Sequence, residues 1–346
     1  MLMWKDILIG ISVLNLLLGI YSCDSHHTPV YQKPAFPTEA DITTHILTDT
    51  ALIAYPYDVC IDDSFLYVLS LVADQWVQVY DKNSGAWICS GIHEGQGPQE
   101  VISGTSLYFD KNTKLFYLYD QGQSKMITFS FDKKEKKFIN IQQISLAETN
   151  GVVRMAWPLG ADRYLTDGQQ GENTKRMQRF LIYEKDRLIT QYDSFPIPET
   201  DKDLIFILAA KSLSPDKTKL AVGTLWGGSL ETFQVSRQIT PISTRLFYPI
   251  DIRFVEGAVR PTEQTIYGFT SLLAFDHRIY GIWIGDKNPN HTSAIVTFDW
   301  EGNEIAKYNT DCILLRICKE SEDSNRIYAI AASEEKGFYI VYFDMA

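Results

Sequence analysis

The chain has 346 residues, of which 45% are hydrophobic and 13% aromatic, and its formal net charge is −11 at pH 7. This acidic balance, with lysines and arginines scattered along the chain, argues against a nucleic-acid partner, which needs clustered cations to displace counterions from phosphates. The length suits one all-β repeat domain as well as two average domains.

The first 23 residues differ in composition from the rest of the chain. Lys5 precedes an apolar run from Ile7 to Tyr21, which is short for a bilayer span of about 20 residues. No basic cluster follows it, so we interpret the segment as a signal peptide. Its end, Leu16-Leu-Leu-Gly-Ile-Tyr-Ser-Cys23, is similar to a bacterial lipobox, although Tyr21 stands where a small residue is usual. We therefore expect lipidation at Cys23, with an ordinary cleaved signal peptide as the alternative.

Residues 24–43 contain Pro29, Pro34 and Pro37 and have few periodic apolar residues. This composition predicts a flexible tether between the anchor and a folded domain. From residue 44 to residue 346, short runs rich in β-branched and aromatic residues alternate with turn residues, which indicates β-strands. The predicted organisation is a leader (1–23), a tether (24–43) and one all-β domain (44–346).

Two short β-rich elements recur six times along the predicted domain. The first element starts at residues 66, 115, 163, 219, 278 and 326, and the second ends at residues 81, 132, 184, 236, 299 and 344. A period of about 50 residues fits four strands joined by tight turns, and such sheets bury both faces only by stacking in a closed ring. The pattern predicts an all-β, six-bladed β-propeller with four-stranded blades.

The last of these six units has only three evident strands, around residues 313–317, 327–331 and 338–343. Residues 44–48, ahead of the first unit, can supply the missing fourth strand. Closing the ring in this way removes a free sheet edge. We therefore predict that an N-terminal strand closes the last blade.

The first unit contains Tyr57-Asp-Val-Cys-Ile-Asp-Asp-Ser-Phe-Leu-Tyr-Val, Val79-Tyr-Asp-Lys-Asn-Ser-Gly85 and Gly95-Gln-Gly-Pro-Gln-Glu100. With the repeat and the lipobox-like start, these segments resemble the TolB-like six-bladed propeller lipoproteins of Bacteroidetes over most of residues 45–346. The resemblance implies a lipid anchor at the periplasmic face or the outer-membrane surface, and no particular reaction. Proteins of this group can be O-glycosylated at Asp-Ser/Thr-small sites, so Asp49-Thr50-Ala51 implies a glycosylation site at Thr50.

The loop Gly95-Gln-Gly-Pro-Gln-Glu100 is the sharpest local feature and makes Glu100 a candidate ligand-binding residue. Two glycines and a proline favour an unusual backbone turn. Glu100 either projects toward the central channel or accepts backbone N–H groups at a corner between blades, and we favour the corner.

Further candidate ligand-binding residues lie near the predicted first strands, which line the channel of a propeller: Asp58, Arg154, Lys211 and Arg316. The basic residues either hold an anionic ligand or pair with Asp58 or Glu100. Trp226, beside two glycines, is a candidate for stacking on a sugar ring, whereas packing between blades is the alternative for Trp226, Trp157 and Trp283.

No catalytic or metal signature stands out in the sequence. His93-Glu94 lacks the second histidine of His-Glu-x-x-His, and there is no Gly-x-Ser-x-Gly. We therefore predict no metal and no cofactor, and favour a ligand-binding or protein-interaction module in the cell envelope, with a glycan, a peptide or an envelope protein as partner. The alternative is a carbohydrate-active hydrolase or lyase whose acid and base come from different blades at the channel mouth.

Four cysteines follow the leader: Cys60, Cys89, Cys312 and Cys318. None has zinc-type spacing. Export permits disulfides, including a Cys60–Cys89 bond, but we favour free thiols that behave as small apolar residues.

Overall fold

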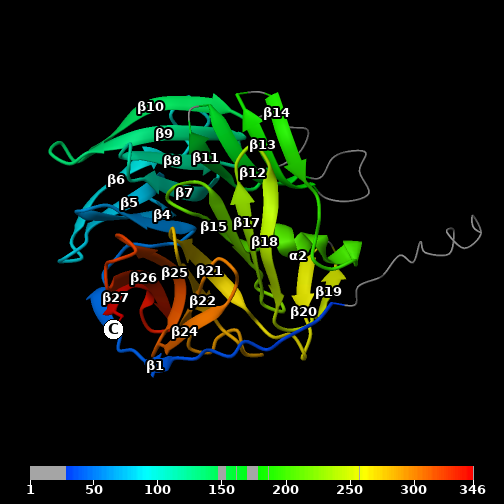
Figure 1. The fold of residues 1–346 in the computed structure, drawn as a ribbon. Helices are drawn as coiled ribbons and strands as arrows, with labels where there is room; N and C mark the ends of the chain where they lie inside the picture. Colours follow the sequence, from blue (N-terminus) through cyan, green and yellow to red (C-terminus); the bar gives the residue numbers. More distant parts are fainter. Residues whose placement is uncertain are drawn as a thin grey trace, which may run out of the picture. The chain divides into compact units, whose positions relative to one another are not determined.

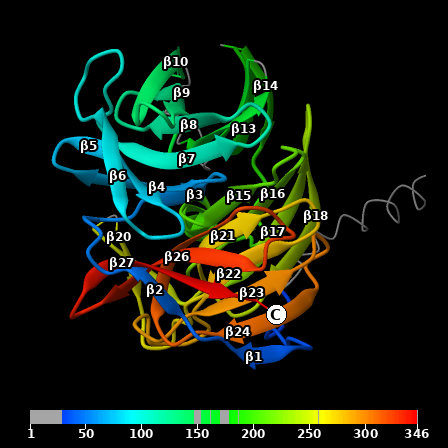
Figure 2. The same cartoon turned by 90° about the vertical axis from the view of Figure 1, so that its left-hand side faces the viewer.

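The computed structural model describes residues 29–146, 153–160, 162–169, 178–185, 187–256 and 258–345. From Tyr31 onward the chain forms one compact unit. Its strands build six blades of four antiparallel strands each, which follow one another around a centre to form a β-propeller (Figure 2). The predicted fold class is therefore confirmed.

The strands of the first three blades follow chain order from the channel outward. Blade 1 contains β3 (Asp58–Ile61), β4 (Phe65–Val72), β5 (Gln75–Asp81) and β6 (Trp87–His93). Blade 2 contains β7 (Gly104–Asp110), β8 (Leu115–Asp120), β9 (Lys125–Asp132) and β10 (Lys137–Ser145). Blade 3 contains β11 (Ala156–Gly160), β12 (Arg163–Gln169), β13 (Gln178–Glu184) and β14 (Arg187–Tyr192).

The other blades repeat this order, with N-terminal strands added at the outer edges of the last two. Blade 4 contains β15 (Ala210–Leu213), β16 (Lys219–Gly223), β17 (Ser229–Val235) and β18 (Ile239–Leu246). Blade 5 contains β21 (Phe269–Ala274), β22 (Ile279–Trp283), β23 (Ala294–Phe298) and β24 (Glu304–Asn309), with β1 (Glu39–Asp41) beside β24. Blade 6 contains β25 (Ile313–Lys319), β26 (Arg326–Ser333), β27 (Gly337–Asp344) and β2 (His45–Thr48).

The two repeated sequence elements are the second and third strands of each blade. These strands are buried along nearly their whole length, as in β4 and β5, because neighbouring blades cover both faces of each sheet. The hydrophobic core is accordingly divided into clusters between blades. Tyr67 of blade 1, for example, packs on Phe116 of blade 2 with ring centroids 4.4 Å apart.

The last blade is closed by β2, which pairs antiparallel with β27 from the other end of the chain. Its pairs include His45 with Tyr342 and Ile46 with Val341. The turn at Gly85 of blade 1 packs directly on this strand: a Cβ at Gly85 would lie 2.6 Å from the Leu47 carbonyl oxygen. The N-terminal closing strand was predicted correctly.

The segment before β2 is not a free tether over its predicted length. Gln32 N–H donates to the Leu246 carbonyl at 2.8 Å, and the Phe36 ring packs edge-on against Phe298. β1 then pairs in parallel with β24 of blade 5. The predicted boundary at residue 44 therefore lies too late in the chain, because residues 31–43 are bound along blades 4 and 5. The predicted leader and Cys23 lie outside the described residues.

Two insertions between blades lie together on the right-hand side in Figure 1. A short helical segment, η1 (Thr200–Lys202) and α2 (Asp203–Ile207), precedes blade 4, and a hairpin, β19 (Ile252–Val255) with β20 (Ala258–Pro261), precedes blade 5. Both contribute to one apolar cluster. Within the described ranges, no helix has the length and apolarity needed to cross a membrane.

Candidate functional site

The central channel contains a cavity of 320 Å³. First strands of all six blades line it, because each blade places its first strand next to the axis. Residues that represent the six blades in order are Asp58, Leu107, Trp157, Lys211, Leu272 and Ile317.

The cavity opens on the face that carries the first turn of each blade. Exposed Asn112, Asp216 and Asp276 border it, and each lies in the turn that follows a first strand. Antiparallel strands alternate in direction, so fourth strands end on the opposite face. Leu246 ends β18, so Tyr31, which bridges to Leu246, joins the ring on the face away from this mouth.

Lys211 closes the inner end of the cavity, where the protein itself satisfies its charge. Its ammonium lies 2.8 Å from the Asp167 carboxylate and donates to the carbonyls of Ile207 and Ala209 at 2.7 and 3.0 Å. Burial lowers the pKa of Lys211, and the Asp167 carboxylate opposes this shift. The structure thus places Lys211 at the channel, as predicted, and holds its ammonium in an internal ion pair.

A second buried ion pair lies nearby, between blades 3 and 4. Arg179 is 0% exposed and binds both carboxylate oxygens of Glu231. Four phenylalanine rings surround the guanidinium, with centroids 5.1 to 5.4 Å away: Phe180, Phe195, Phe206 and Phe233. The sequence analysis missed this pair, since its members are far apart in the chain and match no motif.

Asp58 also lines the inner part of the cavity. Its carboxylate accepts the N–H groups of Leu107 and Val59, both at 2.9 Å. Burial raises the pKa of Asp58, and these hydrogen bonds and the positive charge of Arg316 offset part of the rise. Arg316 donates to the Tyr57 carbonyl at 2.7 Å, so it lies beside Asp58 and outside the cavity lining.

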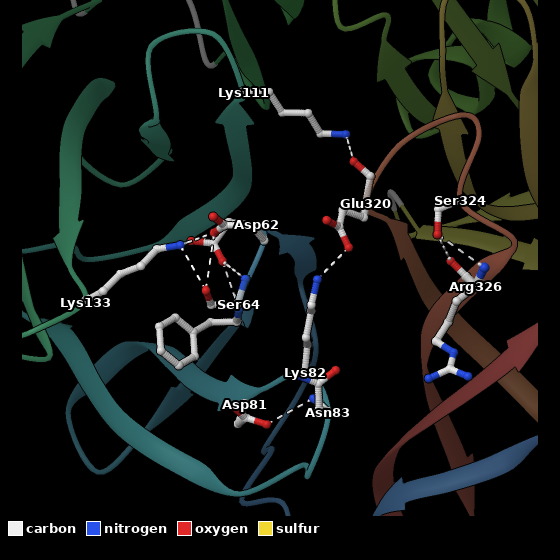
Figure 3. A network of polar contacts seen from close by, with 12 residues as sticks. Asp62, Ser64, Asp81, Lys82, Asn83, Lys111, Lys133, Glu320, Ser324 and Arg326 are labelled. Atoms are coloured by element: carbon white, nitrogen blue, oxygen red, sulfur yellow. Dashed lines mark hydrogen bonds and ion pairs between the residues drawn. The ribbon is translucent and has the colours of Figure 1, made fainter.

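The mouth carries two lysines that the sequence analysis did not single out. Lys111 follows the first strand of blade 2, and its ammonium donates to the Glu320 carbonyl of blade 6 (Figure 3). The Glu320 carboxylate is already paired with Lys82 of blade 1 at 2.6 Å (Figure 3). Lys319, at the end of β25, donates to the Tyr280 hydroxyl at 3.0 Å. These two lysines are cavity-lining residues from blades 2 and 6.

Glu100 does not line the cavity. Its carboxylate turns back and accepts the Gly97 N–H at 2.8 Å, which is the corner that the sequence analysis favoured. Gly95 has a φ of +153°, which side chains rarely adopt, so the loop favours glycine there, and a Cβ would also displace the Glu100 carboxylate. Lys125 stabilises this turn because its ammonium donates a hydrogen bond to the Glu100 carbonyl at 2.6 Å. The alternative in which Glu100 projects into the channel is wrong.

Two further candidate residues, Arg154 and Trp226, also lie outside the cavity lining. Arg154 precedes β11, and its charge contributes to the lowered pKa of Lys211. Its Nη1 has no hydrogen-bond partner among the described residues. Trp226 packs against the apolar cluster around the interblade insertions, as the packing alternative predicted. Trp157 and Trp283 are buried, each 4% exposed.

The four cysteines after the leader are free in the structure. Cys60 and Cys318 line the cavity, and burial raises the pKa of both thiols. In the part of the chain that the structure describes, no three His, Cys, Asp or Glu side chains converge as a metal site. Thr50 is exposed just after β2, and its glycosylation stays a prediction.

Comparisons with known proteins agree with this architecture. A family model described as TolB-like 6-blade propeller-like matches residues 35–322. Among solved structures, a Bacteroides fragilis protein described as a candidate exported protein is 14% identical, with a TM-score of 0.57 over 91% of this chain and 99% of that one. A calcium-binding regucalcin from Agrobacterium tumefaciens is 11% identical, with a TM-score of 0.50 over 89% and 97%.

A luciferin-regenerating enzyme is 8% identical, with a TM-score of 0.52 over 88% of this chain and 95% of that one. At these identities the likeness establishes the fold alone. No curated protein matches the sequence.

Proposed function

The chain belongs to the TolB-like six-bladed propeller family, and from this premise we propose that it is an exported, lipid-anchored module that binds a ligand in its central channel. The observation that carries the proposal is the cavity of 320 Å³ that first strands of all six blades line. Ligand sites are concave, mostly apolar and equipped with a few polar groups, and this cavity combines Leu107, Leu272 and Ile317 with Asp58 and Lys111.

Export and anchoring are supported by the leader-like first 23 residues and by the lipobox-like sequence that ends at Cys23. The bound N-terminal segment begins at Tyr31 on the face opposite the mouth. The mouth lies on the other face and stays accessible to a glycan, a peptide or an envelope protein. Changing Cys23 to Ser is expected to move the protein from the membrane to the soluble fraction, and unchanged fractionation would refute the anchor.

Ligand binding is tested with purified residues 29–346, which contain the whole compact unit. Libraries of glycans, short peptides and small organic molecules are screened by thermal shift, and hits are measured by calorimetry. Leu273→Trp narrows the cavity, whereas Leu188→Trp adds the same side chain on the exposed outer strand β14. We expect Leu273→Trp alone to abolish binding; hits that survive it would place the ligand elsewhere.

One observation favours the rival function, a carbohydrate-active hydrolase or lyase. Burial raises the pKa of Asp58, as is common for general acids, and this carboxyl faces the cavity. Turnover of generic ester or glycoside substrates that is lost in Asp58→Asn would favour the enzyme. Binding without turnover in the same assays would favour the module.

A further inference from the structure

The two lysines at the channel mouth converge on one aromatic ring. Lys111 comes from blade 2 and Lys319 from blade 6, and their ammonium groups lie 5.4 and 5.8 Å from the ring centroid of Phe275 in blade 5. Lys111 also reaches toward Glu320 of blade 6, to whose carbonyl it donates (Figure 3). Lys319 is 5% exposed, and burial lowers the pKa of the half-buried Lys111.

Neither ammonium forms an ion pair with a residue that the structure describes. Among the described residues, no carboxylate lies within the 4.0 Å of an ion pair from Lys111 or Lys319, and both donate only to carbonyl or hydroxyl oxygens. Two other lysines on this face form ion pairs, Lys82 with Glu320 and Lys217 with Asp110, both at 2.6 Å, whereas Lys219 donates to the Asp276 carbonyl, also at 2.6 Å. Lys111 and Lys319 are thus partly desolvated positive charges without an ion-pair partner among the described residues, and the Glu320 and Asp276 carboxylates act on Lys111 only from beyond that distance.

The carboxylates around the mouth are occupied or face solvent. Asp216 accepts hydrogen bonds from Ser214 and Thr218 within its own turn, and Asp276 is exposed. Farther in, Leu213, Leu272 and Ile317 form apolar walls. A ligand with an anionic head and an apolar body matches this order of surfaces. Three aspartates, Asp58, Asp216 and Asp276, also line the cavity. Because their negative charges repel an anionic ligand, the cavity favours a ligand with one negative charge over a highly charged phosphate.

We propose that the channel binds a small organic carboxylate, with its carboxylate on Lys111 and Lys319 and its apolar body between the inner strands. This inference rests on the proposed function and specifies its ligand class. On binding, the Lys111 ammonium exchanges the Glu320 carbonyl for the ligand carboxylate. The exchange replaces a neutral acceptor of the ammonium by an oppositely charged one, and the added Coulomb attraction favours the complex.

The test compares three probes that share a phenyl ring and a four-carbon chain: 4-phenylbutyrate, 4-phenylbutanamide and 4-phenylbutylamine. Affinities are measured by calorimetry for wild type, Lys111→Met and Lys307→Met. Methionine keeps most of the apolar stem of lysine, and Lys307 pairs with Glu39 on the outer edge of blade 5. We expect the carboxylate to bind about ten-fold more tightly than the amide.

Lys111→Met should remove this preference, whereas Lys307→Met should keep it. If the amide or amine binds as well as the carboxylate and Lys111→Met changes nothing, the inference is overturned while channel binding stands. If no probe binds and the broader libraries also give no hit that Leu273→Trp abolishes, the proposed function fails together with the inference.

Discussion

Basic residues at the two ends of the central channel have different partners. At the inner end, Lys211 has the Asp167 carboxylate, and Arg179 nearby has both oxygens of Glu231. At the mouth, Lys111 and Lys319 have only carbonyl and hydroxyl oxygens. The comparison teaches that a basic residue in the channel is not by itself a ligand site. Charges held in ion pairs inside the protein belong to the fold, and charges at an opening without an ion-pair partner are available to a ligand.

The largest expected effect comes from breaking the compensated inner charges. Arg179→Met leaves Glu231 buried without a partner, which typically costs about 3–5 kcal/mol of unfolding free energy. Chemical denaturation measures the loss. The double variant Arg179→Met/Glu231→Leu removes both charges and should recover most of it. A single variant that unfolds like wild type would contradict the structural role of this pair.

The fold was largely predictable because its signals are local. Strand runs and turn residues recur in every blade, and the short last unit pointed to the N-terminal strand that pairs with β27. The bound segment at residues 31–43 was missed because its partners lie far along the chain: Glu39 pairs with Lys307. The prolines of this segment suggested a tether. No local sequence pattern indicates that it covers the outer edge of blade 5.

The site was less predictable than the fold. Asp58 and Lys211 were placed at the channel correctly, since first strands line it. Lys111 and Lys319 look like ordinary lysines at strand ends. Only the closure of the propeller brings both ammonium groups close to the Phe275 side chain. Whether a charge is compensated also depends on partners from other blades, which spacing along one chain does not reveal.

A smaller loss is expected at the corner of Glu100, which also uses its charge inside the fold. Glu100→Gln keeps the shape but weakens the hydrogen bond from Gly97, and should lower the unfolding free energy by about 1–2 kcal/mol. Chemical denaturation checks this value. Carboxylate affinity at the mouth should stay at the wild-type level, and its loss would mean that the corner and the channel are coupled.

Asp58 gives a pH-dependent test of the inner end. Its carboxyl has a pKa above the ordinary 3.8, so the native state holds the proton more tightly than the unfolded state. Stability contributed by this group therefore grows as pH falls through the raised pKa. Relative to Asp58→Asn, wild type should become more stable as the pH is lowered from 7 toward the ordinary carboxyl pKa of 3.8, measured by denaturation at each pH. An unchanged difference would argue against a desolvated carboxyl.

The smallest effect on stability is expected at the mouth. Lys111→Met breaks no ion pair within the fold and removes one hydrogen bond, so the unfolding free energy should change by no more than about 1 kcal/mol. Chemical denaturation of Lys111→Met and Arg179→Met under the same conditions compares their losses of unfolding free energy, and so tests the difference between the two ends of the channel. A loss for Lys111→Met as large as that for Arg179→Met would remove the distinction.

The most direct measurement of the central claim is NMR of the lysine side-chain nitrogens during titration with 4-phenylbutyrate. We expect the Nζ signals of Lys111 and Lys319 to shift with the carboxylate, while that of Lys211, held by Asp167, stays in place. A Lys211 signal that shifts while those of Lys111 and Lys319 remain unchanged would contradict a ligand site at the mouth.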